Sequence, residues 1–202
     1  MKIWFFYFVK ITAIPMLLYY RPKYYYPGGK KIRIKGGALA IANHIGLTDP
    51  IYVLMAFWYR RMRFVAMKEF FEKPLSRWFF TSCGCIPIDR ANPGMDTFRA
   101  VADRLKNEEL VAIFPEGHVQ DTEGVMQKFK SGMVLMALQG QRPIVPVYLK
   151  PRAHWWQRQR IAVGEPIDII ALYGKRPTMK EIEAISELLY EKEEELERLT
   201  VK

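Results

Sequence analysis

The sequence predicts an α/β fold in which helices flank a central β-sheet that is mostly parallel or mixed. Short apolar runs typical of buried strands alternate with helical stretches from residue 30 onward. Polar residues follow several of these runs, at the strand ends where ligands gather in parallel sheets. The chain has 202 residues and no repeat or low-complexity tract, so we expect one domain with a sizeable core.

The first segment of the chain is almost wholly apolar and aromatic. Residues 3–20 are interrupted by Lys10, Thr12 and Pro15, and the run is slightly short for a membrane span, which needs about 20 apolar residues. Tyrosines and basic residues follow it, as in the headgroup zone of a membrane. We therefore expect residues 1–29 to be a membrane-associating helical segment at the bilayer interface and 30–202 to be the main domain. A buried core helix followed by a solvated basic loop is the alternative.

The remaining elements are predicted from the apolar pattern and from prolines that mark the starts of helices. Pro50 and Pro93 suit the first turns of helices, and a helical stripe of Ile and Leu beneath an acidic face marks the C-terminal helix. Strands are expected at 32–34, 38–42, 63–67, 84–89, 110–114, 144–149 and 161–163, and helices at 51–58, 70–80, 93–107, 132–138 and around 182–199.

Positive charge is concentrated outside the C-terminal helix. The net charge is +10, but residues 180–199 hold eight Glu against three basic residues, so the rest of the chain carries +15. Such a chain favours an anionic partner: nucleic acid, a membrane surface or phosphorylated substrates. Aromatic and basic residues interleave at 57–61 and 152–160, which could clamp single-stranded nucleic acid. Because no nucleic-acid module is present and the N-terminus is apolar, we expect an anionic membrane surface and no nucleic acid.

Cysteine and histidine usage argues against a metal centre. Cys83 and Cys85 flank Gly84, and in an extended segment they would point to opposite faces, so we expect no disulfide between them. Two thiols are too few for a structural zinc site, and the three histidines are scattered. We expect ordinary buried or half-buried cysteines of a reducing compartment, no metal and no resident cofactor. The absence of Gly-x-Ser-x-Gly from the sequence argues against a serine hydrolase.

The central motif is Asn43-His44-Ile45-Gly46-Leu47-Thr48-Asp49-Pro50, which joins the strand at 38–42 to the helix at 51–58. A histidine at a strand end and a carboxylate at the next helix start can meet across a tight loop, as a general base and its orienting acid must. The competing interpretation is that Asp49 only caps the helix and His44 is only a loop residue.

Three further segments carry residues that could bind a ligand at the ends of strands or at the start of a helix. Arg90 comes just past the strand at 84–89, where a guanidinium can hold a phosphate bidentately or simply pair with Asp89. Glu116 and Gly117 follow the strand at 110–114, where glycine allows close approach to a ligand. Lys130 precedes a helix start and could meet an anion there.

Together these segments resemble the ordered motif blocks of the glycerolipid acyltransferases, and most closely the PlsC-type 1-acylglycerol-3-phosphate acyltransferases. The matching blocks are Asn43-His44 with Asp49, residues 84–90, residues 114–117 and residues 144–147. Each block is weak alone, but four in order and at the expected spacing across residues 30–165 are specific. The resemblance implies that 30–202 is an acyltransferase domain.

The resemblance also implies a reaction. An acyl group would pass from an acyl thioester, either acyl-CoA or acyl-carrier protein, to the free hydroxyl of lysophosphatidate, making phosphatidate in phospholipid biosynthesis. His44 would be the general base on that hydroxyl, and Asp49 would orient its imidazole. No enzyme-bound acyl intermediate would form. The protein would be membrane-associated at the cytoplasmic side, as a peripheral or monotopic enzyme.

Further roles follow residue by residue from the resemblance. Arg90 would hold the phosphate of the acceptor, with Lys130 as a helper. Glu116 and Gly117 would bind the glycerol-phosphate end of the acceptor. Pro146 would belong to the block that shapes the acyl pocket.

Two of the motifs depart from the family pattern. The family usually continues Glu-Gly with Thr-Arg-Ser, whereas this chain has His118-Val119-Gln120, so an arginine expected near the phosphate is missing. Either His118 or Lys130 replaces it, or the acceptor is glycerol 3-phosphate or another lysolipid. Gly46 stands where a serine is common. A non-catalytic membrane-binding module on the same fold is the rival of another class, and the intact pair of His44 and Asp49 argues against it.

Overall fold

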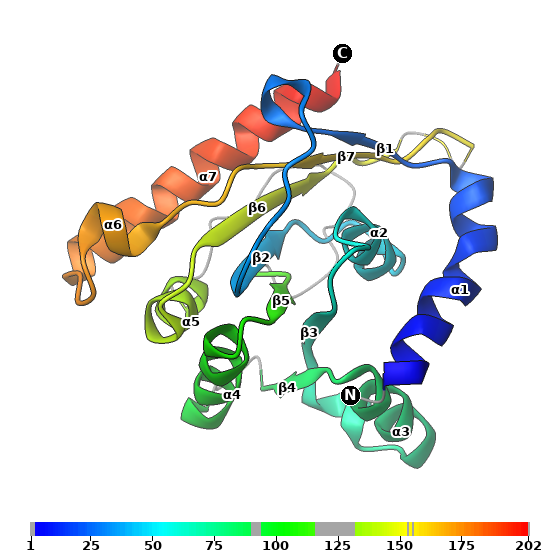
Figure 1. Cartoon of the computed structure of the whole chain (residues 1–202), viewed down its shortest axis with the longest axis horizontal. Coiled ribbons are helices and arrows are strands. Elements are labelled where there is room, and N and C mark those ends of the chain that lie inside the picture. The colour runs from blue at the N-terminus through cyan, green and yellow to red at the C-terminus, as the bar shows by residue number, and fades with distance from the viewer. Residues whose placement is uncertain (1–2, 90–93, 116–131, 153, 155, 202) are drawn as a thin grey trace.

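The computed structural model describes residues 3–89, 94–115, 132–152, 154 and 156–201 (Figure 1). The elements in chain order are α1 (Ile3–Tyr20), β1 (Lys23–Tyr25), η1 (Pro27–Gly29), β2 (Ala38–Ala42), α2 (Asp49–Ala56), β3 (Met62–Met67), η2 (Lys68–Phe71), α3 (Pro74–Cys83), β4 (Ile86–Ile88), α4 (Met95–Lys106), β5 (Leu110–Ile113), α5 (Gly132–Gly140), β6 (Ile144–Leu149), β7 (Arg160–Val163), α6 (Ile169–Tyr173) and α7 (Met179–Val201).

The strands form one mixed, seven-stranded sheet in the order β1-β7-β6-β2-β5-β3-β4. Five neighbouring strands, from β6 to β4, are parallel, whereas β7 runs antiparallel to β6 and carries β1 parallel to itself. The predicted α/β class with a mixed, helix-flanked sheet is therefore confirmed. Because β7 is antiparallel to β6, the starts of β7 and β1 lie at the same edge of the sheet as the carboxyl ends of β2 and β6.

Helices cover both faces of the sheet. One hydrophobic cluster joins the sheet to α4, α5, α6 and α7, and the other joins it to α1 and α2. Figure 1 shows these two groups on opposite sides of the strands, with α3 beside the N-terminal end of α1.

Strand β2 shows why the sheet forms where it does. All five of its residues are buried, and alternate side chains enter opposite clusters, as the two-residue period of a strand requires. Leu39 and Ile41 pack under the α4–α7 layer, while three alanines face α2. Small side chains on that face let α2 lie close to the strand that leads into the central motif.

Several predicted elements need correction. Residues 32–34 are not a strand, because the backbone N–H of Ile34 donates to the Tyr59 hydroxyl and its carbonyl accepts from Arg60 rather than from a neighbouring strand. The edge strand β1 at Lys23–Tyr25 was not predicted. The helix expected at 70–80 is divided, because Pro74 begins α3 after the 3₁₀ turn η2.

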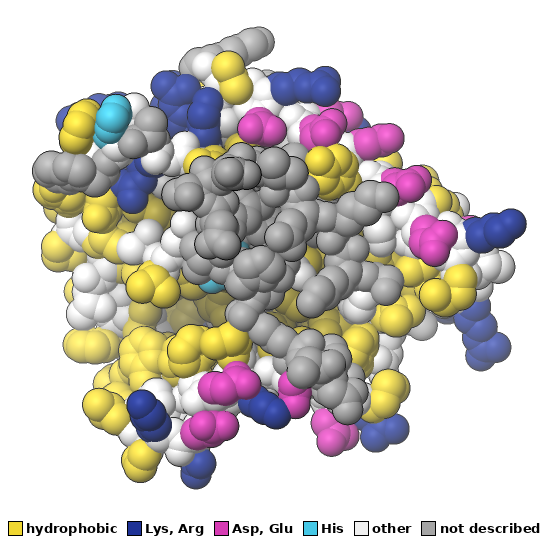
Figure 2. Space-filling view, turned by 180° about the vertical axis from the view of Figure 1, so that it is seen from behind, with side chains coloured by type: hydrophobic (Ala, Val, Ile, Leu, Met, Phe, Trp, Pro, Cys, Tyr) yellow, Lys and Arg dark blue, Asp and Glu magenta, His cyan; other side chains and the backbone are white. Residues whose placement is uncertain are grey.

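The surface separates into distinct regions. Figure 2 shows acidic side chains along α7 and hydrophobic side chains gathered over α1 on the opposite flank. Among the described helices, none combines the length and apolar character that crossing a bilayer requires.

Candidate active site

The end of β2 is fixed to its neighbour β6 by Asn43. Its side chain is 1% exposed; its amide nitrogen donates to the carbonyl of Leu149 at 2.8 Å, and its oxygen accepts from the Leu149 N–H at 2.7 Å. These two bonds extend the pairing of β2 and β6 by one more step. They fix the point at which His44 leaves the sheet, a role that sequence reasoning did not assign to Asn43.

His44 and Asp49 meet across the loop. Asp49 Oδ2 lies 2.8 Å from His44 Nδ1, and the same oxygen accepts from the backbone N–H groups of Ile45 at 2.6 Å and Gly46 at 2.7 Å. The residue at the N-cap of α2 is Thr48, and Asp49 lies within the first turn. Asp49 is therefore not the cap: its buried carboxylate holds the loop and the imidazole instead.

The tautomer of His44 follows from this contact. A carboxylate only accepts hydrogen bonds, so Nδ1 carries the proton and Nε2 is the nitrogen with the free lone pair. The His44 ring stacks on Phe114, with ring centroids 4.5 Å apart, and Phe114 in turn stacks on Phe64. The ring is held between a carboxylate and an aromatic face and is 15% exposed.

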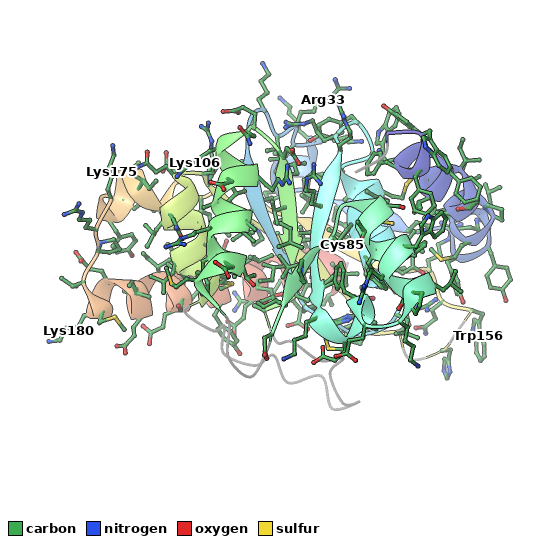
Figure 3. All side chains as sticks on the ribbon, turned by 90° about the horizontal axis from the view of Figure 1, so that it is seen from below. Arg33, Cys85, Lys106, Trp156, Lys175 and Lys180 are labelled. Carbon is green, nitrogen blue, oxygen red and sulfur yellow. The ribbon has the colours of Figure 1, made fainter. Side chains whose placement is uncertain are left out.

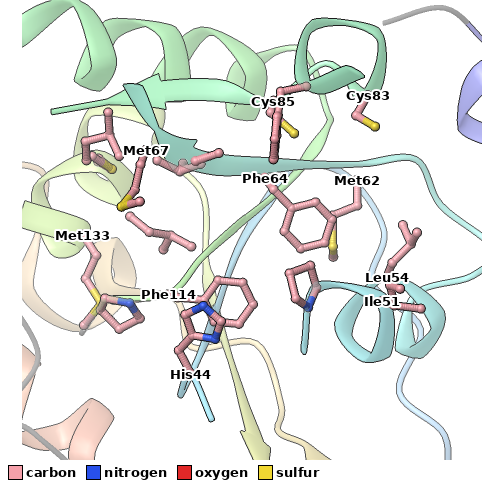
Figure 4. Close-up of a pocket in the computed structure, with 18 of the residues that line it drawn as sticks. His44, Ile51, Leu54, Met62, Phe64, Met67, Cys83, Cys85, Phe114 and Met133 are labelled. Carbon is pink, nitrogen blue, oxygen red and sulfur yellow. The ribbon is translucent and has the colours of Figure 1, made fainter. Parts of the chain in front are cut away.

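His44 lies on the wall of a cavity of about 420 Å³ (Figure 4). The other lining side chains are apolar apart from two thiols, and they come from α1, α2, β3, α3, β4, α4, β5 and α5. Pro146 lies in β6 and is not among the described residues that form this wall. A base at the side of an apolar cavity can act on a group attached to a hydrocarbon chain.

The two thiols correct an expectation. Gly84 ends α3 in the left-handed conformation, with φ of 72°, so Cys83 and Cys85 are not in an extended segment. Both thiols are free, half-buried and part of the cavity wall. They are hydrogen-bonded to each other, which lowers the pKa of Cys83 and, together with burial, raises the pKa of Cys85.

The other predicted site residues, Arg90, Glu116, Gly117, His118 and Lys130, lie outside the described residues. Their described neighbours in the chain do reach the site. Cavity-lining residues include Ile88 at the end of β4, Pro115 after β5 and Gly132 at the start of α5. The ends of three further elements therefore converge on the same cavity as His44.

Lys68 was missed by sequence reasoning. It follows β3 directly, and its ammonium forms an ion pair with Asp89, which follows β4. The hydrogen bond and charge of Asp89 raise the pKa of Lys68, which therefore stays cationic. A lysine directly after an apolar strand was the available signal, because parallel strands place such residues at one edge of the sheet.

Comparison with known proteins points in one direction. The family model described as Acyltransferase matches residues 23–150. A Bacillus subtilis protein named 1-acyl-sn-glycerol-3-phosphate acyltransferase is 27% identical over 181 residues, which are 84% of this chain and 89% of the relative. A Streptococcus pneumoniae protein of the same name is 31% identical over 139 residues, 65% of this chain but only 50% of the relative.

The fold is also that of a solved acyltransferase structure. The crystal structure of the 1-acyl-sn-glycerophosphate acyltransferase PlsC from Thermotoga maritima superimposes with a TM-score of 0.69 at 19% identity. The superposition covers 98% of this chain and 80% of that protein.

Proposed function

Because this chain belongs to the Acyltransferase family, we propose that it transfers an acyl group from an acyl thioester to the free hydroxyl of 1-acylglycerol 3-phosphate, producing phosphatidate for phospholipid synthesis. The observation that carries the proposal is the hydrogen-bonded pair of His44 and Asp49 beside an apolar cavity. The names of the relatives support the choice of acceptor.

The chemistry follows from the tautomer. His44 Nε2 takes the proton of the acceptor hydroxyl as its oxygen attacks the thioester carbonyl. The imidazolium that forms is stabilised by the buried carboxylate of Asp49, which keeps its own charge. When the tetrahedral adduct collapses, the carbon–sulfur bond breaks and the imidazolium proton passes to the leaving thiolate. Ester, free thiol and neutral histidine result, and no acyl-enzyme intermediate is needed.

The cavity supplies binding energy for a hydrocarbon chain. Each methylene moved from water into its wall contributes about 0.8 kcal/mol. The acyl chain of a substrate can therefore be anchored beside His44 without any polar contact. Polar recognition then falls to residues at the strand ends.

In this proposal the phosphate of the acceptor meets cations at those strand ends. Arg90 holds it, Glu116 and Gly117 bind the glycerol-phosphate end, and either Lys130 or His118 replaces the arginine that the chain lacks at Val119. The support comes from chain neighbours of three of these positions, which line the cavity. An acceptor panel of lysophosphatidate, glycerol 3-phosphate and other lysolipids distinguishes the remaining alternatives.

We propose further that residues 1–29 bring the 30–202 domain to an anionic membrane from its cytoplasmic side. One face of α1 docks on the domain through Phe5, Phe6 and Ala13. The ammonium of Lys10, the charge within α1, turns towards the protein and donates to the carbonyls of Trp58 and Arg60, and burial lowers its pKa. The opposite face exposes large apolar side chains: Trp4, Tyr7, Phe8, Ile11, Ile14, Leu18 and Tyr19. An apolar face free of charge suits the bilayer interface.

The reaction is tested by thiol release. Purified protein with lysophosphatidate and an acyl thioester should release free thiol, and His44→Ala should abolish the release while its melting temperature stays close to that of the parent. A folded His44→Ala protein that retains activity would overturn the mechanism. Absence of turnover in the parent with every acceptor of the panel would overturn the proposed function.

The membrane proposal is tested with a matched pair of substitutions. Leu18→Glu on α1 removes a side chain that is 72% exposed, and Leu172→Glu on α6, on the other flank of the sheet, removes one that is 61% exposed. Burial of a leucine in an apolar environment contributes about 1.5–3 kcal/mol, so Leu18→Glu should weaken binding to anionic vesicles at least tenfold. Equal vesicle binding by the two variants would refute a role for α1.

A further inference from the structure

A second cavity, of about 580 Å³, lies at the same edge of the sheet as His44. It is formed by the starts of β1 and β7, the end of β6 and the connection between β6 and β7. Five of its eight lining residues are cations, namely Lys23, Lys150, Arg152, Arg158 and Arg160, and none of the eight is acidic. Three of these five residues, Arg152, Arg158 and Arg160, belong to the aromatic and basic stretch at 152–160, for which the sequence predicted contact with a membrane surface.

Three of the five cations make specific contacts. Arg160 Nη1 donates to the carbonyl of Thr200 at 2.7 Å, and the Arg152 guanidinium lies over the Tyr20 ring, 4.5 Å from its centroid. Lys23 lies over the ring of Tyr25 at 4.8 Å. Bringing five like charges around one hollow costs free energy unless an anion binds between them. The pocket is therefore built for a ligand with several negative charges.

A buried polar frame supports the pocket. The side chain of Gln159 is 1% exposed and donates to the carbonyl of Lys150 at 2.8 Å. The backbone N–H of Lys150 donates to the carbonyl of Arg160 at 2.9 Å, and that of Lys23 to Gln159 at 2.8 Å. These hydrogen bonds join the two ends of the β6–β7 connection. They fix the backbone positions from which the side chains of Lys150 and Arg160 extend.

The pocket is linked to the reacting centre. Leu149, which pairs with the side chain of Asn43, is followed directly by Lys150, and Asn43 is followed by His44. The pocket extends from β6, the neighbour of β2, to β1, which is three strands from β2. Because adjacent strands lie roughly 4.8 Å apart, the pocket lies roughly 5–15 Å from the end of β2 along the edge of the sheet. An anion in the pocket would belong to a molecule whose reactive group can reach His44.

We propose that this basic pocket binds the phosphate groups of a nucleotide-linked acyl donor, acyl-coenzyme A. The inference rests on the proposed function, since it names the donor of that reaction. Coenzyme A carries a diphosphate and a ribose phosphate at the end of an arm with two amide units, which spans roughly 15 Å when extended. The arm matches the separation between the pocket and His44, while the acyl chain occupies the apolar cavity.

The shape of the pocket favours this ligand over two macromolecular alternatives. A hollow of a few hundred cubic ångströms is typical of small-ligand sites. An acidic carrier protein needs a broad contact of roughly 800 Å² on each partner. Polybasic segments that bind an anionic membrane surface act as clusters of Lys and Arg beside the membrane, whereas these five cations converge on a hollow.

The test uses the full chain and the double variant Lys150→Gln with Arg158→Gln. The matched control is Lys175→Gln with Arg176→Gln, which removes the same charge from two exposed residues in the turn before α7. Figure 3 shows Lys175 at the far end of the molecule from Trp156, which lies in the β6–β7 connection. Binding of free coenzyme A is measured by isothermal titration, which needs no turnover.

The pocket variant should bind coenzyme A at least tenfold more weakly than the parent and the control. With lysophosphatidate as acceptor, its KM for acyl-coenzyme A should rise at least tenfold with little change in kcat. Its KM for the same acyl group on N-acetylcysteamine, which has no phosphate, should stay unchanged. Coenzyme A binding without turnover in the parent would overturn the proposed acyl transfer but not the pocket assignment.

Three results would overturn the assignment. Unchanged coenzyme A binding by the pocket variant is the first. Loss of anionic-vesicle binding with normal coenzyme A affinity would assign the pocket to lipid headgroups. A rise in KM confined to acyl-carrier protein would assign it to an acidic protein donor.

Discussion

Asp49 offers the sharpest test of the proposed reaction, because one oxygen makes all three of its side-chain hydrogen bonds to described residues. Oδ2 accepts hydrogen bonds from His44 Nδ1, from Ile45 N–H and from Gly46 N–H. Asn at this position can direct its single amide oxygen to the same three donors. Asp49→Asn should therefore keep the loop and the tautomer of His44 and remove only the negative charge.

The expected loss of rate can be worked from the geometry. Two unit charges about 4 Å apart interact by roughly 4 kcal/mol at the effective dielectric constant of about 20 that suits proteins. That energy stabilises the imidazolium in the transition state, and each 1.36 kcal/mol corresponds to about a factor of ten in rate. We expect kcat of Asp49→Asn to fall by roughly 10²- to 10³-fold.

Asp49→Ala should behave differently. It leaves two part-buried backbone N–H groups without their carboxylate acceptor, and each such loss costs about 1 kcal/mol or more. For a domain of this size, 1 kcal/mol corresponds to about 2–4 °C in melting temperature, so Ala should melt roughly 4 °C or more below the parent. Asn should melt close to the parent.

The assay pairs thiol release with thermal unfolding for the parent and both variants. A kcat of Asp49→Asn within threefold of the parent would refute the charge argument and leave Asp49 as a loop acceptor. Equal melting temperatures for Asn and Ala would refute the claim that the carboxylate oxygen holds the loop.

Three further predictions follow from single contacts. A maleimide that reacts with Cys83 should fill the cavity and inactivate the enzyme, because hydrogen bonding with Cys85 lowers the pKa of Cys83. Cys83→Ser should slow this inactivation at least tenfold, and equal inactivation rates in the parent and the variant would contradict the prediction. Gly46→Ser should change the free energy of unfolding by less than about 0.5 kcal/mol, because a Cβ there meets only Asp49 Oδ1, at 3.8 Å; denaturant unfolding checks it. Thr178→Ala should lower the melting temperature by removing a capping box with Glu181. The hydrogen bonds from Thr178 lower the pKa of Glu181. Their stabilising effect is therefore present near neutral pH and is lost as the pH falls through that lowered pKa. Thermal unfolding of the parent and the variant at several pH values measures this difference.

The sheet was largely predictable because its central strands are local signals. Residues 38–42, 110–113 and 144–149 are continuous apolar runs, and burial on both faces demands this composition. Strand β1 has no such signal: its three residues Lys23–Tyr25 form a strand only because β7 pairs with them. A pairing between segments more than 130 residues apart cannot be read from a local window.

The sequence allowed the contact between His44 and Asp49 to be predicted, but not the hydrogen bonds that surround it. The sequence allowed Asp49 to serve either the helix or His44, and only the three-dimensional loop decides, since Thr48 occupies the N-cap position. The thiols show the same limit. Cys83 and Cys85 were placed on opposite faces by assuming an extended segment, but Gly84 with its positive φ folds them together.

Helix α1 connects the membrane proposal to the chemistry. Phe6 and Val9 line the cavity that begins at His44, and the opposite face of the same helix exposes the apolar side chains proposed to enter the bilayer interface. In the proposed function, one helix therefore forms both part of the wall of the acyl cavity and the contact with the membrane. In the proposed function a hydrocarbon chain would pass from lipid to cavity alongside this helix without crossing water, which would otherwise cost about 0.8 kcal/mol for each exposed methylene. The basic pocket beyond the end of α1 would keep the charged part of the donor outside the apolar region.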